Sequence, residues 1–325
     1  MRKWILPEHI EDILPDEAER IESLRRVLLD HFAARGYRLV QPPLVEHLDS
    51  LLTGTGRDLE LQTFKVVDPL SGRLLGVRAD ITPQVARIDA HLLNESGITR
   101  LCYAGSVLRT LPAGIGATRE VVQIGAELYG EPGIAGDREV IEVLLSALTA
   151  AGLARLHLDL GHVGVYRALA NASGISTNGD DSDLFAALRA KDVPLVAELT
   201  ARLPTVWRDA LTALPALYGP AQEVIAAARA GLPDVPAISN ALAALTTLAQ
   251  AAGPLVEALH VDLADLTGYH YQNGVNFAVF TRGEANTIGN GGRYDGIGKS
   301  FGRARPATGF TLDLRQLAGL IARGA

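Results

Sequence analysis

Two stretches of strand-forming sequence, Arg100 to Leu111 and Arg119 to Tyr129, constrain the fold of this chain more than any other feature. The residues between them begin Pro112-Ala113-Gly114-Ile115-Gly116 and suit only a loop, because proline and glycine interrupt regular structure. Strands joined by so short a connection pair antiparallel, since a parallel crossover needs a dozen or more residues. A mostly antiparallel sheet is therefore expected.

The sequence on either side of this strand pair predicts a mixture of helices and strands. Apolar residues recur at helical spacing from Asp16, a candidate cap, to Gly36, and a short strand over 37–41 ends at Pro42-Pro43. The other predicted elements are a hairpin over 64–78, a short helix from Thr82, a helix over 138–151 capped by Asp137, strands over 156–160, 268–281 and 307–312, and a last helix from Leu314. The mixture predicts an α+β fold in which helices flank the sheet.

The chain has 325 residues, which is long for one compact domain. Its texture changes after about residue 163, where alanine, leucine and short polar linkers dominate until about residue 255. We predict a core made of residues 1–163 and 255–325, and a mainly helical insertion over 164–254.

Composition excludes several classes of function. The 30 basic and 37 acidic residues give a net charge of −7, which argues against an extended nucleic-acid surface. The lone cysteine, Cys102, cannot form a disulfide within the chain, and the eight histidines contain no metal-type pair, so no metal is expected. The start of the sequence is not a signal peptide, and no apolar stretch reaches the roughly 18–20 residues of a membrane span. A cytoplasmic protein without membrane contact is expected.

A phosphate-binding loop is only approximated. Gly298-Lys299-Ser300 ends like one, but Arg293 occupies the position of the required upstream glycine. This segment therefore does not predict a P-loop nucleotide-binding site.

The strand over 119–129 carries the clearest candidate binding surface. Alternation separates an apolar face (Val122, Ile124, Ala126, Leu128) from a mixed face (Arg119, Val121, Gln123, Gly125, Glu127). A half-exposed sheet with a wet polar face would explain the pattern equally well. Gly125 favours a site instead, because it leaves the face locally uncovered where a ligand could approach.

Other side chains extend this candidate site. Arg109 shares its face with Tyr103 on the neighbouring strand, and guanidinium groups suit a carboxylate or a phosphate. A carboxylate beside an amide, as in Glu127 and Gln123, suits an ammonium group. The combination fits an amino acid. Asp80 and Thr82 precede a helix, so they could be caps or could point over the end of the sheet.

Together these segments resemble the catalytic core of histidyl-tRNA synthetases, which are class II aminoacyl-tRNA synthetases. The similarity covers residues 7–160 and 255–320, and its most specific part is Gly291-Gly292-Arg293-Tyr294-Asp295-Gly296. Arg78 to Thr82 is similar to the segment that contacts the amino acid, while the strand pair and the segment Gly309 to Leu317 resemble the second and third class II motifs.

The resemblance implies a class II synthetase-like fold with a histidine pocket. The implied pocket residues are Asp80, Thr82, Gln123 and Glu127, with Arg109 facing the ligand carboxylate, Tyr269 or Tyr271 near the ring, and Gly291, Gly292, Arg293 and Tyr294 as a wall.

Departures from the family pattern affect ATP and tRNA contacts. Thr267 stands where the family has its catalytic arginine, a loss that costs about 3–4 kcal/mol in the transition state. Leu111, Asp313 and Gln316 replace the residues expected to contact or accommodate ATP. The sequence also ends straight after the third motif, so no anticodon-binding domain is expected.

With these departures the chain is similar to the regulatory subunits of ATP phosphoribosyltransferase, which act in the first step of histidine biosynthesis. The resemblance implies a non-catalytic dimer that needs no cofactor, binds histidine, and mediates feedback inhibition of a short catalytic subunit without binding tRNA. Two alternatives stay open: an active class II amino-acid ligase, and a standalone histidine-sensing module.

Overall fold

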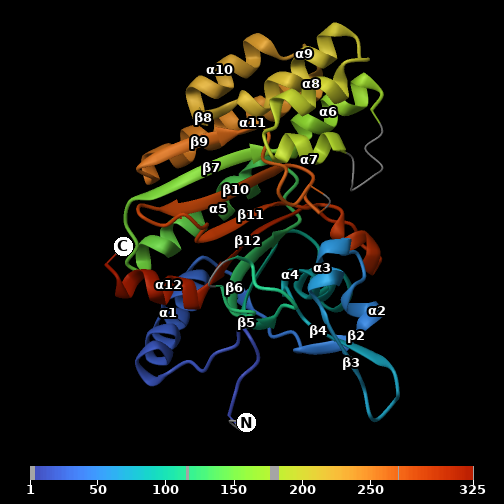
Figure 1. Ribbon diagram of the computed structural model, residues 1–325. Coiled ribbons are helices and arrows are strands. Elements are labelled where there is room, and N and C mark those ends of the chain that lie inside the picture. The colour runs from blue at the N-terminus through green and yellow to red at the C-terminus, as the bar shows by residue number, and fades with distance from the viewer. Residues whose placement is uncertain (1–3, 115–116, 176–182, 270, 325) are drawn as a thin grey trace. The chain divides into compact units, whose positions relative to one another are not determined.

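The computed structural model describes residues 4–114, 117–175, 183–269 and 271–324 (Figure 1). Part of the predicted glycine-rich loop, residues 115 and 116, lies outside these ranges. The chain divides into two compact units: Met1–Pro132, Ser146–Ala154 and Asp295–Ala325 form the first, and Gly133–Leu145 and Arg155–Tyr294 form the second. Each unit is described by itself.

The first unit contains four strands of the main sheet. In spatial order these are β1 (Arg38–Leu39), β5 (Thr99–Leu108), β6 (Glu120–Tyr129) and β12 (Ala307–Asp313). β6 runs antiparallel to both β5 and β12, whereas β1 is parallel to β5. The predicted antiparallel strand pair and its mostly antiparallel surroundings are therefore confirmed.

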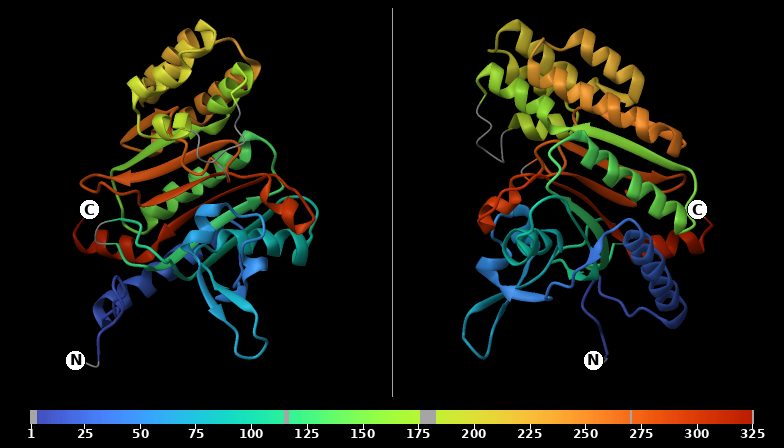
Figure 2. Two further views of the ribbon diagram at one scale, coloured as in Figure 1. Left: turned by 45° about the vertical axis from the view of Figure 1, so that its right-hand side comes forward. Right: turned by 180° about the vertical axis from the view of Figure 1, so that it is seen from behind.

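Helices and a small second sheet complete the first unit. The sheet has the order β2 (Val45–His47), β4 (Leu74–Val77), β3 (Phe64–Val67), which confirms the predicted hairpin. The helices are α1 (Pro15–Ala34), α2 (Leu48–Leu51), α3 (Arg57–Gln62), α4 (Thr82–Arg87), the π-helix η1 (Ile88–Leu93), the 3₁₀-helix η4 (Ile297–Phe301) and α12 (Leu314–Ala322). α1 and α12 lie side by side (Figures 1 and 2).

The buried face of α1 explains why it packs on this sheet. Ile21, Leu24, Leu28 and Phe32 are spaced for one helical face, and all four are buried. The Phe32 ring meets Phe310 of β12 edge-on, with 5.6 Å between ring centroids. The apolar residues that recur at helical spacing thus form the face of α1 that packs on the sheet.

The second unit combines five strands with most of the helices. Its strands follow the order β11 (Gly289–Arg293), β10 (Val275–Thr281), β7 (Leu156–His162), β9 (Ala258–Asp262), β8 (Tyr218–Pro220). Its helices are α6 (Val163–Ser173), α7 (Asp183–Arg189), α8 (Val193–Thr200), α9 (Thr205–Ala213), η2 (Leu214–Ala216), α10 (Ala221–Gly231), α11 (Pro236–Ala252) and η3 (Gly253–Leu255), while α5 (Ile134–Ala150) contributes to both units. The predicted insertion boundaries at 164 and 254 stay a prediction, because compactness groups these helices with neighbouring strands.

Three sequence-based predictions need correction. Asp16 is not the cap of α1; Leu14 holds that position without a side-chain bond, and Pro15 begins the helix. Asp137 is not a cap either, because α5 begins at Ile134. The strand predicted over 268–281 begins only at Val275, since Gly268 adopts a φ of 72° and its carbonyl accepts the amides of residues 271 and 272 in a turn.

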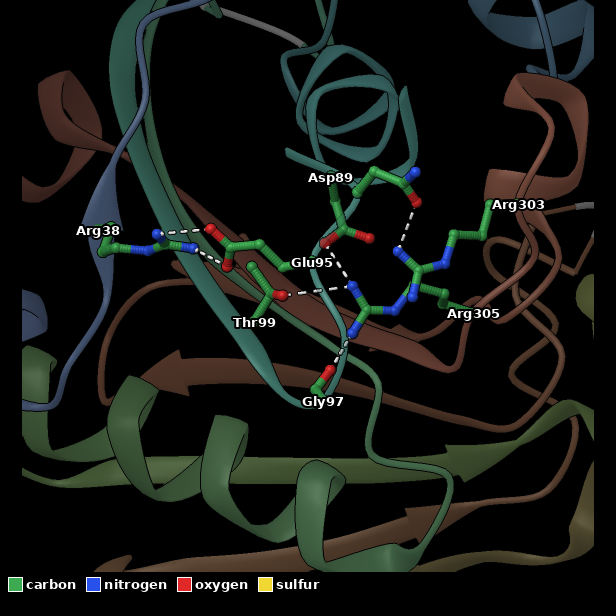
Figure 3. A network of polar contacts seen from close by, with 8 residues as sticks. Arg38, Asp89, Glu95, Gly97, Thr99, Arg303 and Arg305 are labelled. Carbon is green, nitrogen blue, oxygen red and sulfur yellow. Dashed lines mark hydrogen bonds and ion pairs between the residues drawn. The ribbon is translucent and has the colours of Figure 1, made fainter. Parts of the chain in front are cut away.

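A buried ion pair fixes the approach to β12 (Figure 3). The guanidinium of Arg305 donates to Asp89 Oδ1 at 2.7 Å and to Thr99 Oγ1 at 3.3 Å, and it also bonds the Gly97 carbonyl. Arg305 and Asp89 are 8% and 1% exposed, so this pair lies in the core. It ties the segment before β12 to the π-helix η1, which continues from α4.

None of the helices within the described ranges is both long enough and apolar enough to cross a membrane.

Candidate functional site

The mixed face of β6 is buried, not wet. Gln123 and Glu127 are only 2% and 1% exposed, so the solvent-exposed alternative does not hold for them. The strand register places Gln123 opposite Asp313 and Glu127 opposite Gly309 on β12, and places Gly125 opposite Tyr103 on β5. We use the name carboxylate floor for Asp80 and Thr82 at the start of α4 together with residues of three neighbouring strands: Tyr103 on β5, Gln123 and Glu127 on β6, and Gly309 and Thr311 on β12.

Glu127 lies at the centre of the carboxylate floor. Its Oε1 accepts hydrogen bonds from the Thr82 hydroxyl and from the Tyr103 hydroxyl, each at 3.1 Å. A side chain on Gly309 would place its Cβ 1.6 Å from Glu127 Oε2, so only glycine fits opposite the carboxylate.

The space above Gly125 is filled by the protein itself. A Cβ at this position would lie 2.4 Å from the Tyr103 hydroxyl oxygen and 2.4 Å from the Phe310 carbonyl oxygen. The expectation that a ligand approaches over Gly125 is therefore wrong; the glycine admits the tyrosine ring instead. Burial, and then the charges of Glu127 and Asp80, raise the pKa of Tyr103 well above its usual value, so its hydroxyl stays protonated.

Gln123 orients Asp80 through its side-chain amide, whose nitrogen and oxygen both form hydrogen bonds. Its Nε2 donates to Asp80 Oδ1 and to Thr311 Oγ1, both at 2.8 Å, and its Oε1 accepts the Ile81 amide at 2.9 Å. Asp80 Oδ1 also accepts the Thr82 amide at 3.0 Å, but the N-cap of α4 is Ile81 and Thr82 is its first residue, so the prediction that Asp80 and Thr82 are caps is wrong. The other oxygen, Oδ2, receives no hydrogen bond from the part of the chain that is described, and the side chain is half-buried.

Arg109 and Asp313 contribute opposite charges at one end of the floor. Arg109 follows β5, and its Nε lies 3.5 Å from the Ala79 carbonyl oxygen. Burial raises the pKa of Asp313, and hydrogen bonds from the first turn of α12 and the charge of Arg109 oppose this rise. Arg315, the next cation along the chain, pairs instead with Glu17 at 2.8 Å and Glu11 at 2.9 Å.

The remaining predicted residues belong to the second unit. Tyr269 packs against Tyr166 and Phe185, with centroid distances of 5.5 and 5.1 Å, and the Arg167 guanidinium lies 4.6 Å from its ring centre. Tyr271 stacks on Tyr294 at 4.9 Å. The structure therefore brings Asp80, Thr82, Arg109, Gln123 and Glu127 together in one unit, and the tyrosines and the glycine motif together in the other.

The glycine motif is shaped by packing within the second unit. Gly291 accepts a hydrogen bond from Gln272 Nε2 at 3.2 Å, and a Cβ on Gly292 would lie 2.6 Å from the same nitrogen. Arg293 is buried, and its Nε lies 3.0 Å from each carboxylate oxygen of Asp137. That ion pair explains why Asp137 does not cap α5.

Sequence reasoning missed Tyr103, Thr311 and Gly309 as parts of the carboxylate floor. Tyr103 was placed on the correct face, but only the register of β5 against β6 shows that its hydroxyl reaches Glu127. A signal was present, because glycine at 125 next to a large aromatic residue on the paired strand is typical of a ring crossing a strand.

Comparisons with known proteins agree with this geometry. The family profile described as Histidyl-tRNA synthetase matches residues 9–317. A curated ATP phosphoribosyltransferase regulatory subunit from Ralstonia nicotianae is 58% identical over 98% of this chain and 82% of its own length. One from Thiobacillus denitrificans is 57% identical over 98% of both chains. This chain belongs to the family of ATP phosphoribosyltransferase regulatory subunits.

A solved structure supports the same assignment at the level of the fold. The Bacillus halodurans protein titled an ATP phosphoribosyltransferase regulatory subunit/histidyl-tRNA synthetase is 27% identical, with a TM-score of 0.86 over 98% of this chain and 83% of that one. The predicted class II synthetase-like α+β fold is thereby confirmed. Membership of the family gives the chain a regulatory role in histidine biosynthesis.

Proposed function

We propose that this chain is a non-catalytic cytoplasmic subunit that binds free histidine on the carboxylate floor and transmits its occupancy to a short catalytic ATP phosphoribosyltransferase subunit. The observation that carries the proposal is that two carboxylates, Asp80 and Glu127, belong to one hydrogen-bonded set, with the Arg109 guanidinium at the Ala79 carbonyl next to Asp80. A zwitterion with an additional N–H donor on its side chain complements that set, and histidine is such a ligand.

Each end of histidine has a fitting partner. Asp80 Oδ2 receives the α-ammonium group, the Glu127 carboxylate receives a ring N–H, and Arg109 faces the ligand carboxylate. Thr82 and Gln123 hold the two acids in place.

The lack of catalysis is supported by the residues in the positions of the synthetase ATP contacts. Thr267 is exposed, and its amide donates to Asp265 at 2.9 Å, so no cation is supplied there. Leu111 is 70% exposed, and Asp313 adds a negative charge beside Arg109. The rival is an active class II ligase. Histidine-dependent exchange of labelled pyrophosphate into ATP by the purified protein would establish that rival instead.

Regulation requires histidine to favour one state of the complex over another. A coupling free energy of about 1–3 kcal/mol is sufficient, and it must appear reciprocally as tighter histidine binding in the inhibited complex. In the synthetases the first class II motif forms a dimer interface, so the regulatory chain is proposed to act as a dimer within the larger assembly.

Calorimetry tests the site, and co-purification tests the partner. Glu127→Ala should abolish histidine binding with the circular-dichroism spectrum unchanged, whereas Glu95→Ala, at the exposed ion pair with Arg38, should bind as the parent does. Equal histidine affinity in Glu127→Ala and the parent would disprove this pocket. A short catalytic subunit that neither binds the chain nor gains histidine sensitivity from it would favour the standalone sensor.

A further inference from the structure

Two hydroxyl groups meet one oxygen of the Glu127 carboxylate. The Tyr103 hydroxyl donates to Glu127 Oε1 at 3.1 Å, and the Thr82 hydroxyl donates to the same oxygen at 3.1 Å. The two hydroxyl oxygens also lie 3.1 Å from each other. Tyr103 comes from β5 and Thr82 from the start of α4, so two separate elements hold this acid.

Counting hydrogens shows which groups donate. The Tyr103 and Thr82 hydroxyls each carry one hydrogen, and both are used on Glu127 Oε1, so neither is left for the contact between the two hydroxyl oxygens. Hydrogen bonds donated to a carboxylate favour its ionised form.

We propose that Tyr103 is a positioning residue that keeps the Glu127 carboxylate ionised and fixed, so that the histidine site recognises its ligand through an anion that only accepts hydrogen bonds. The proposal rests on the proposed function as far as the ligand is concerned. A donor bonded to a charged acceptor contributes more than one bonded to a neutral acceptor.

The strand geometry is built for this contact. Glycine at 125 lets the Tyr103 ring cross β6, and glycine at 309 leaves room for the carboxylate on β12. Any side chain at either position would collide with the hydroxyl or with the acid. Two glycines in neighbouring strands would be a costly choice for packing alone, because glycine weakens a strand.

Two titratable groups in the described part of the first unit lie near this acid. β5 presents Tyr103, and Asp80 lies ahead of α4, close enough for its charge to act on the same hydroxyl. β12 presents Gly309 and Thr311 here, and its charged residue Asp313 lies opposite Gln123 instead. Because Asp80 is also negative, it opposes ionisation of Glu127, and the donated hydrogens must outweigh that repulsion.

Carbon-13 NMR of glutamate-labelled protein tests the proposal without any ligand. The Glu127 carboxyl signal is the one missing from Glu127→Gln, and its titration midpoint should rise by about one pH unit in Tyr103→Phe, since a hydrogen bond to a charged group changes an equilibrium about tenfold. Thr82→Val, which removes the second hydroxyl donor, should raise the midpoint as well. Tyr37→Phe, at a buried tyrosine that packs on Phe32, should leave it unchanged. A midpoint that stays the same in Tyr103→Phe would overturn the proposal.

Histidine titrations at several pH values give a second measure. Tyr103→Phe should weaken binding most at the acidic end of the pH series, by up to about tenfold, and less as the pH rises and Glu127 ionises in both proteins. Titration of histidine itself cancels in the ratio of the two affinities. A ratio that does not vary with pH would mean that Tyr103 serves packing only. If the parent protein binds no histidine, the proposed function fails, while the NMR titration still decides the role of Tyr103.

Discussion

Buried carboxylates in the first unit are held in two different ways. Asp89, in the core beside η1, pairs with the guanidinium of Arg305 at 2.7 Å (Figure 3). On the carboxylate floor, Asp80 accepts only an amide side chain and a backbone N–H from the described residues, and Glu127 accepts the hydroxyls of Thr82 and Tyr103. The first arrangement neutralises the charge, and the second keeps the charge while orienting it.

The difference separates a structural acid from a binding acid. Removing one partner of a buried ion pair leaves an isolated charge, which is among the costliest single changes in a protein. When an acid held by neutral donors becomes neutral, the protein loses little stability. The site, however, loses its attraction for a cationic or N–H-bearing ligand. Stability and histidine binding should therefore respond to different mutations.

The largest expected effect is that of Arg305→Ala. It leaves Asp89 buried and unpaired and should lower the free energy of unfolding by about 3–5 kcal/mol, measured by urea denaturation. The double variant Asp89→Asn with Arg305→Met should recover much of that loss, because no isolated charge remains.

Arg38 and Glu95, which appear in the same view, provide the matched control. Their side chains are 53% and 41% exposed, so Arg38→Ala should cost at most about 1 kcal/mol. Similar losses for Arg305→Ala and Arg38→Ala would contradict the contrast between neutralised and oriented acids. So would a large loss of stability in Glu127→Gln.

A second prediction extends the comparison to a buried base. Burial, and then the charges of Arg167 and Arg293, lower the pKa of His162 to about 4, and its neutral Nδ1 accepts the Gly164 amide at 3.0 Å as the cap of α6. The unfolded chain binds a proton near pH 6.5 and the folded one near pH 4, so stability falls as the pH drops through that window.

At pH 5 this difference amounts to about 2 kcal/mol. His162→Asn keeps a capping side chain but cannot be protonated, so its free energy of unfolding should fall less than that of the parent between pH 7 and pH 5. Urea denaturation at both pH values measures the difference. Equal losses in the two proteins would show that His162 is protonated in the folded state.

Local patterns predicted the sheet better than they predicted the caps. Alternation, turn residues and helical spacing are all local patterns. They predicted the strand pair, the hairpin over 64–78 and the helix α1. Asp137 was predicted as a cap, but α5 begins at Ile134 and the Asp137 carboxylate pairs with Arg293, 156 residues away along the chain. The turn that begins at Gly268 was missed, because the residues after it suggested a strand.

The carboxylate floor shows the same limit. Alternation placed Gln123 and Glu127 on one face, and the resemblance to the synthetases added Asp80, Thr82 and Arg109, so the charged groups could be predicted. The neutral groups that orient them could not be. Tyr103 and Thr311 reach the floor only through the register of β5 and β12 against β6, and register depends on the whole sheet.

The smallest expected effect concerns Asp313, which combines both ways of holding an acid. Burial raises its pKa, and the hydrogen bonds from the first turn of α12 and the charge of Arg109 only partly offset this. Because the folded pKa is raised, the native state binds more protons than the unfolded state between the two pKa values, and stability declines as the pH rises through that window.

Asp313→Asn keeps the cap to the Arg315 amide and removes the buried charge. It should be more stable than the parent at pH 7, and the gain should vanish at low pH, where the acid is protonated in both states. Loss of stability at pH 7 would instead mean that Arg109 neutralises Asp313 as fully as Arg305 neutralises Asp89.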